Sequence, residues 1–238
     1  HNAKLVTNDG SGDLSQGPFK STPGTPFLTP LQEFALVISA AIHDVGHLGL
    51  NNKFLVDTSS HFARLYHDRS VNENMHMDIA FKLLEAPEHD VMKMLDQSSR
   101  RDLRGMLIRI VLQTDMAFHG DLMGKFLDVA EANKGKPVKD WDDPIVALEL
   151  ILHVADISNP ARPNNRFFKW AEMLSEEFFV QGEKEAELGM PVTPFCNRAT
   201  ANIFKNQLGF IDVVVNSSFE ALSLVIEPSL HEELHTTL

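Results

Sequence analysis

The segment AAIHDVGHLGLNNKF, residues 40–54, decides how the rest of the chain is interpreted. An apolar run stops there at His43 and Asp44, so two strong metal ligands stand at the end of a buried segment. Ionisable groups in such a place are costly to desolvate unless they are paired or bound to a metal ion. Imidazole and carboxylate suit Zn²⁺, and the carboxylate can also bridge to a harder ion such as Mg²⁺ or Mn²⁺. A lone His-Asp pair is weak evidence, but Asp156 ends a second apolar helix in the same way.

Apolar residues at helical spacing lead into this stretch and recur after it. Thr29 and Pro30 are a good N-cap and first turn for a helix that runs to Ile42, and glycines then end it. A second helix is predicted to begin at Ser70, as its N-cap, and to stop near Pro87. Later helices are predicted over about 99–118 with Met116 on its apolar face, from 144 to about 155, over about 165–188, and over about 200–226 with Phe204, Leu208, Ile211 and Val215 on one face.

Residues 1–28 are rich in Gly, Ser, Thr, Pro, Asn and Asp and show no helical or strand period, so we expect an irregular polar leader. Residues 133–143 read as a polar loop. No internal repeat appears, and nothing marks a second domain boundary within residues 29–238. The predicted fold class is all-α, a compact multi-helix bundle.

Composition and charge exclude several classes of partner. The formal net charge of -12 argues against nucleic acid and anionic membrane surfaces, which are bound mainly through Lys and Arg. The apolar run from Phe34 to Ile42 falls well short of the ~20 residues that a membrane helix needs, so no membrane span is expected. The single cysteine, Cys196, fits a reducing compartment and predicts a cytoplasmic, intracellular protein. An anionic substrate would need a local positive centre, for which metal ions are the obvious candidate.

Six segments in a fixed order resemble the class I cyclic nucleotide phosphodiesterase family, over residues 29 to about 226. The first is the segment that begins with His43 and Asp44. The others are LYHDRSVNEN (65–74), QTDM (113–116), ADISNP (155–160), EEFF with QGEKE (176–185) and NQLGFID (206–212). The resemblance implies an all-helical catalytic domain of the HD-domain type. It also implies hydrolysis of the cyclic phosphodiester of cAMP or cGMP to the 5′-monophosphate, which ends a cyclic nucleotide signal.

The resemblance implies two divalent metal ions and their ligands. His43, Asp44 and Asp156 would bind the tighter metal, resembling a zinc site, and Asp44 would also bridge to a second ion, usually magnesium. Such ions neutralise phosphate oxygens and lower the pKa of water from about 15.7 to about 7 on zinc. The family places a further ligand histidine four residues after the first histidine of its first motif, and this sequence has Leu5 there.

The same resemblance assigns catalytic roles to four residues. His47, Glu73 and Asp115 would orient the metal ligands and waters, and His1 would be the acid that protonates the departing ribose oxygen. Glu73 and His76 considered alone indicate only a solvated helix face, and His153 is interpreted as a structural histidine.

Five residues resemble the family's nucleotide pocket. The amides of Asn159 and Gln207 would hydrogen-bond the purine edge, and Phe210 would stack on its face. Phe178 and Leu174 would line the opposite wall. A side-chain amide can present either donor or acceptor, so Gln207 alone does not decide between cAMP and cGMP.

Three hypotheses follow. The leading one is a metal-dependent cyclic nucleotide phosphodiesterase with a small-molecule substrate. Its catalytic domain, residues 29–238, would be truncated relative to the family at both ends, its first metal motif within residues 1–28 incomplete, and its regulatory domains outside this chain. The second is a catalytically impaired relative that binds a cyclic nucleotide or a partner, motivated by Leu5. The third, another hydrolase of the His-Asp superfamily, is disfavoured by Asn159 and Gln207.

Overall fold

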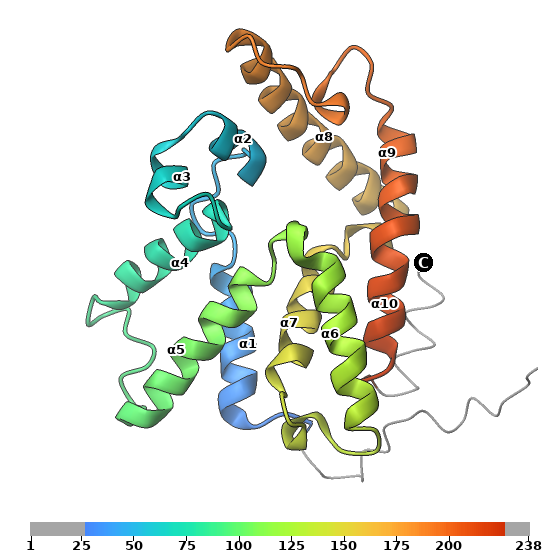
Figure 1. Ribbon diagram of the computed structural model, residues 1–238. Coiled ribbons are helices and arrows are strands. Elements are labelled where there is room, and N and C mark those ends of the chain that lie inside the picture. Colours follow the sequence, from blue (N-terminus) through green and yellow to red (C-terminus); the bar gives the residue numbers. More distant parts are fainter. Residues whose placement is uncertain (1–26, 227–238) are drawn as a thin grey trace, which may run out of the picture.

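Helices make up the regular structure of residues 27–226, which are the residues that the computed structural model describes (Figure 1). The α-helices are α1 (Pro30–Ile42), α2 (Asn52–Asp57), α3 (His61–Leu65), α4 (Val71–Leu84), α5 (Gln97–Leu112), α6 (His119–Ala132), α7 (Ile145–Asp156), α8 (Asn164–Glu187), α9 (Ile203–Phe210) and α10 (Asn216–Ser223). Single turns η1 (Met116–Phe118), η2 (Val138–Asp140), η3 (Asn159–Ala161) and η4 (Pro194–Cys196) connect them, and a π-helical segment, η5 (Ile211–Val215), joins α9 to α10. Within this range there is no strand, and the all-α prediction is confirmed.

The main core lies where α1, α5, α6, α7 and α10 meet. Helix α1 packs on α5 and α7, and α6 and α10 both pack on α7. Leu107, Ile110 and Leu148 are fully buried there. Helix α7 is apolar on nearly all sides and is therefore held firmly in the core. Its C-terminal residue, Asp156, lies at a fixed position at the edge of that core.

Helix α1 begins and ends where its sequence predicts. Thr29 and Gln32 form a capping box, in which each side chain bonds the other residue's backbone N–H, and Pro30 occupies the first turn. The helix ends at Ile42, so His43 and Asp44 emerge together from its C-terminus.

Two helix ends differ from the sequence prediction. Ser70 precedes α4, but its side chain makes no capping bond and its backbone is left-handed, with φ of 41°. The helix predicted to run to residue 118 ends at Leu112, because the Thr114 hydroxyl donates back to the Val111 carbonyl and Asp115 accepts the Ala117 N–H to start η1. Met116 is therefore 43% exposed instead of facing the core.

The predicted apolar face of the last helical region also divides. Val215 is fully buried and Ile211 packs against the core, whereas Phe204 and Leu208 are 71% and 61% exposed. The π-helical turn at 211–215 explains the change, because its extra residue per turn rotates α9 relative to α10.

Helix α8 runs across the upper right of Figure 1, with one end near α2 and the other near α9. Its packing partners are mainly η3, η4 and α9. A Cβ atom at Gly182 would collide with the carbonyl oxygen of Cys196, so only glycine allows η4 to lie this close to α8. None of the helices in residues 27–226 combines the length and apolar character that crossing a bilayer requires.

Candidate functional site

The ends of α1 and α7 bring His43, Asp44 and Asp156 together, and we call these three residues the ligand cluster. Nε2 of His43 lies 3.3 Å from Oδ1 of Asp156 and 3.4 Å from Oδ2 of Asp44. One ligand atom from each residue lies within 4.8 Å of the others. The bond with Asp156 is the main reason that the pKa of His43 rises to about 9 in the absence of an ion.

The orientation of His43 fits a metal ligand. Its Nδ1 lies 3.0 Å from the carbonyl oxygen of Ala40, which only accepts, so Nδ1 carries the proton. Nε2 then faces the two carboxylates: in the imidazolium form it donates a second proton to Asp156, and once that proton leaves it offers its lone pair to a cation. A backbone carbonyl that fixes the tautomer in this way is the usual support of a metal-binding histidine.

His76 of α4 adds a residue that the sequence did not predict for the site. It is 1% exposed, which corrects the interpretation of a solvated helix face. Its Nδ1 donates to the Val45 carbonyl at 2.8 Å, and its Nε2 lies 3.7 Å from Oδ1 of Asp44. Burial lowers the pKa of His76. The signal available in the sequence was its position three residues after Glu73, on the same face of a helix.

Glu73 and Asp115 are both held by hydrogen bonds near the cluster. Nδ2 of Asn52 donates to Oε2 of Glu73 at 2.9 Å, and burial raises the pKa of Glu73 to about 7, with lesser contributions from Asp115 and Asp44. Asp115 is buried, and its Oδ2 accepts the Ser70 hydroxyl at 2.9 Å. The Ser70 hydroxyl thus bonds Asp115 and does not cap α4.

His47 lies in the exposed loop after α1. Its Nδ1 accepts the Gly49 N–H at 3.1 Å, and its ring centroid is 5.7 Å from that of His76. The loop therefore places His47 beside the residue that faces Asp44.

The residues predicted to contact substrate lie on η3, α8 and α9, and we call them the substrate wall. They are Asn159, Leu174, Phe178, Gln207 and Phe210. Asn159 follows Asp156 of the ligand cluster by three residues, and α8 packs on both η3 and α9, so these elements adjoin. The Phe178 ring meets the Phe195 ring of η4 edge-on at 5.2 Å, whereas Phe210 packs partly against the main core.

His153 is a buried histidine, as predicted, one turn before Asp156. It has no exposed surface, and its Nε2 lies 3.0 Å from Nδ1 of His119 on α6. Burial, reinforced by His119, lowers the pKa of His153 to about 4. Nδ1 of His153 has no hydrogen-bond partner among the described residues. Two predicted positions, His1 and Leu5, lie outside the described residues.

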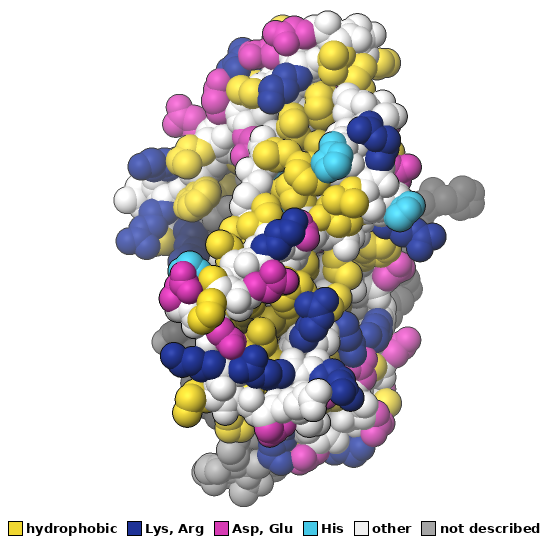
Figure 2. Space-filling model, turned by 90° about the vertical axis from the view of Figure 1, so that its left-hand side faces the viewer, with side chains coloured by type: hydrophobic (Ala, Val, Ile, Leu, Met, Phe, Trp, Pro, Cys, Tyr) yellow, Lys and Arg dark blue, Asp and Glu magenta, His cyan; other side chains and the backbone are white. Residues whose placement is uncertain are grey.

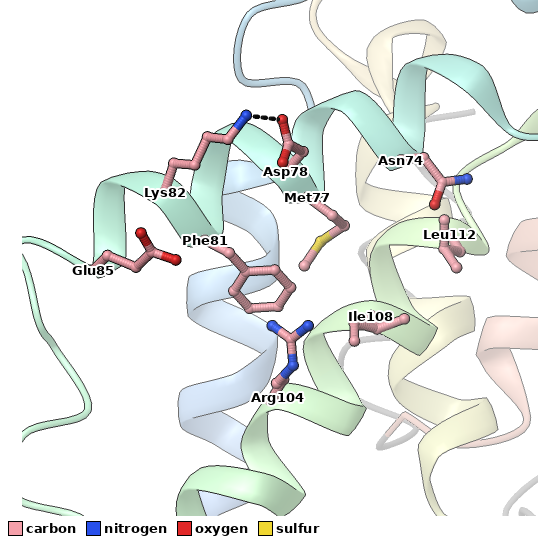
Figure 3. Close-up of a pocket in the computed structure, with 9 residues that line it drawn as sticks. All are labelled: Asn74, Met77, Asp78, Phe81, Lys82, Glu85, Arg104, Ile108 and Leu112. Atoms are coloured by element: carbon pink, nitrogen blue, oxygen red, sulfur yellow. Dashed lines mark hydrogen bonds and ion pairs between the residues drawn. The ribbon is translucent and has the colours of Figure 1, made fainter. Parts of the chain in front are cut away.

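A pocket of about 460 Å³ between α4 and α5 contains none of the predicted site residues. Met77 and Ile108 lie on its floor, and the Arg104 guanidinium lies 3.9 Å from the centre of the Phe81 ring (Figure 3). Lys82 at its rim is paired with Asp78. Seen from the side on which α3 to α5 lie, hydrophobic side chains run down the middle of the surface with Lys and Arg beside them (Figure 2). This pocket is separate from the ligand cluster.

The comparisons with known proteins agree on one family. Residues 14–237 match the family model described as 3′,5′-cyclic nucleotide phosphodiesterase. The chain is 41% identical over 213 residues to a 3′,5′-cyclic-AMP phosphodiesterase, isoform F, of Drosophila melanogaster, which covers 87% of this chain and 32% of that protein. It is 37% identical over 222 residues to 3′,5′-cyclic-AMP phosphodiesterase 4C of Rattus norvegicus, covering 90% of this chain and 41% of that protein.

Among solved structures, the phosphodiesterase domain of the RhoPDE fusion protein from the choanoflagellate Salpingoeca rosetta matches with a TM-score of 0.81 and 31% identity. The match covers 90% of this chain and 69% of that one. The chain thus spans well under half the length of the curated relatives it matches, and about two thirds of the solved domain.

Proposed function

Because the chain belongs to the 3′,5′-cyclic nucleotide phosphodiesterase family, we propose that it hydrolyses the cyclic phosphodiester of a 3′,5′-cyclic nucleotide to the 5′-monophosphate. The observation that carries the proposal is the ligand cluster, in which His43, Asp44 and Asp156 converge from the ends of α1 and α7. Since the relatives at 41% and 37% identity are named for cAMP, cAMP is the first substrate to test and cGMP the second.

The donor set fits the metal ions that the family implies. One imidazole nitrogen with a fixed tautomer and two carboxylates suit Zn²⁺, and the 63% exposed Asp44 side chain has oxygens left for a second ion such as Mg²⁺ or Mn²⁺. When bound, the ions would neutralise phosphate oxygens and lower the pKa of water. In a chain of net charge -12 they would also give an anionic substrate its positive target.

The surrounding residues would hold protons and orient the ligands. Glu73, with a pKa of about 7, can hold or release a proton near neutral pH. Asp115 is fixed by Ser70 and the Ala117 N–H, and we assign it and His47 an orienting role. His1 as the acid for the departing oxygen remains a prediction.

The substrate wall would bind the nucleotide base beside this cluster. The side-chain amides of Asn159 and Gln207 make no hydrogen bond to any residue in the range 27–226, so both are available to a purine edge. Phe178 and Leu174 on α8 would then cover the ring from one side and Phe210 from the other. The lone cysteine and an intracellular substrate favour a cytoplasmic location, and we place regulatory domains outside this chain.

The test is hydrolysis of cAMP and of cGMP by the purified chain with Mg²⁺ or Mn²⁺, together with a count of bound metals by mass spectrometry. Turnover that requires metal supports the proposal. A metal-loaded chain that converts neither nucleotide overturns it, and tight binding of cAMP by such a chain would instead support the nucleotide-binding module suggested by Leu5.

A further inference from the structure

We propose that Gln181 is a positioning residue that ties the loop carrying the metal ligands to the substrate wall. The inference rests on the proposed function and deepens it, because it assigns a role to a residue that belongs to neither the ligand cluster nor the substrate wall. Gln181 lies on α8 and is 2% exposed. Its Oε1 accepts the backbone N–H of Asn51 at 2.9 Å, a bond between residues 130 positions apart.

Asn51 and Asn52 carry this attachment to the ligand cluster. The loop from His43 reaches Asn51 after eight residues, and Asn51 then caps α2 by accepting the Phe54 N–H at 2.8 Å. Asn52 donates to Glu73 and accepts the Asn72 N–H, each through its side chain. A shift of Asn51 would therefore move the partner that fixes Glu73.

The other end of Gln181 is held by Glu185, one turn further along α8. Its Nε2 donates to Oε1 of Glu185 at 2.9 Å. Glu185 is 3% exposed and accepts both the N–H and the hydroxyl of Thr193, at 2.6 Å and 2.9 Å. Burial alone would raise the pKa of Glu185, but the bonds from Thr193 and Gln181 bring it below its usual value. We call Asn51, Gln181, Glu185 and Thr193 the Gln181 relay.

Thr193 begins the turn that holds Phe195 against Phe178. Through α8 the relay thus joins η4, one of the main packing partners of α8, to the Asn51 loop, which is not among those partners. Buried polar groups that are fully satisfied at both ends hold one geometry, and leaving one unsatisfied is costly. The relay would keep the metal-binding loop at one distance from the wall that binds the base.

The first variant to make is Gln181→Met, which keeps the volume and removes the hydrogen bonds to Asn51 and Glu185, along with the long contact from Nε2 to the Cys196 sulfur at 3.9 Å. We expect amide exchange of residues 47–52, measured by hydrogen–deuterium exchange in the metal-free chain, to quicken by at least about tenfold, with α5 and α7 unchanged. With Mg²⁺, kcat for cAMP should fall by about tenfold or more, as for residues that support metal ligands.

The rescue variant is Gln181→Glu combined with Glu185→Gln. This pair exchanges donor and acceptor at constant charge and volume, so Asn51 and Thr193 each keep a partner. We expect it to restore exchange and kcat to within about threefold of the unmodified chain, whereas Gln181→Glu alone places two buried carboxylates together and should not.

Gln32→Met is the matched control, because Gln32 is also a buried glutamine with a backbone partner but lies in the α1 capping box. It should lower stability without changing exchange in residues 47–52. The proposal is overturned if Gln181→Met leaves exchange of residues 47–52 unchanged, or if its effect spreads equally to α5 and α7 and the exchanged pair does not reverse it. The exchange measurement does not require turnover. If the chain had no phosphodiesterase activity, the proposed function would be wrong, but hydrogen–deuterium exchange would still test the Gln181 relay.

Discussion

On the side of the ligand cluster, His43 and His76 each donate Nδ1–H to a backbone carbonyl, and both thereby aim Nε2 at carboxylates. On the substrate wall, the amides of Asn159 and Gln207 have no such bond to any residue between 27 and 226. One side is therefore preorganised by the fold, and the other keeps free hydrogen-bonding groups for a ligand to satisfy. The comparison teaches that changes on the two sides should produce different kinetic losses.

The largest loss is expected from Asp156→Ala. The substitution removes one ligand and the main partner of His43, so bound metal and kcat/KM should fall together, by at least about a hundredfold in activity. Metal content and cAMP turnover measure this, with circular dichroism to show that the helices remain. Asp128→Ala, at an exposed position on α6, is the control. Undiminished turnover in Asp156→Ala would refute the ligand assignment.

The second largest effect is expected at His153, which is buried on α7 one turn before Asp156. His153→Met should change how the free energy of unfolding depends on pH. The pKa of His153 is about 4 in the fold against 6.5 for the free side chain, so between these values the unfolded chain binds more protons. Its contribution, up to about 3 kcal/mol, is present above pH 6.5 and lost as the pH falls toward 4. His119 is half-buried and its pKa is also lowered by desolvation, whereas Asp156 acts to raise the pKa of His153.

Urea unfolding of both proteins in EDTA between pH 4 and 7 measures the difference. The unmodified chain should lose more stability than His153→Met across this window. If the unfolding free energies of the two proteins changed with pH in parallel, His153 would not be held neutral in the fold. The region around the ligand cluster would then be less preorganised than the comparison states.

The smallest effect is expected on the substrate wall. Gln207→Ala removes one amide from the proposed base contact, so KM for cAMP should rise about tenfold, the loss of roughly one hydrogen bond, while metal content stays unchanged. Gln207→Glu, of nearly equal size, separates the amide's chemistry from its bulk. A fall in bound metal in either variant would break the distinction between the two sides.

The sequence predicted those parts of the molecule that depend on local pattern. Helix α1 has a capping box at one end and His43 and Asp44 at the other, and its bounds follow the prediction. The ligand cluster was predicted from resemblance, and the structure brings its three residues together. The sequence pattern did not predict helices α3 and α6.

What the sequence did not predict depends on contacts between distant residues. His76 looks solvated in sequence because its partner, the Val45 carbonyl, is a backbone group 31 residues away. Ser70 has the right residue type for an N-cap, but Asp115 competes for its hydroxyl. Gln181 belongs to a motif that resembles the family, yet its bond to Asn51 leaves no local pattern.

The close approach of η4 to α8 has a practical consequence for Cys196, the only cysteine in the chain. Its thiol is 1% exposed, and burial, with a smaller effect of Glu185, raises its pKa to about 11. A thiol reagent can therefore react only in moments when the turn lifts away from Gly182. The labelling rate of Cys196 in the unmodified chain therefore reports how often η4, which carries Phe195, separates from α8, and no engineered probe is needed.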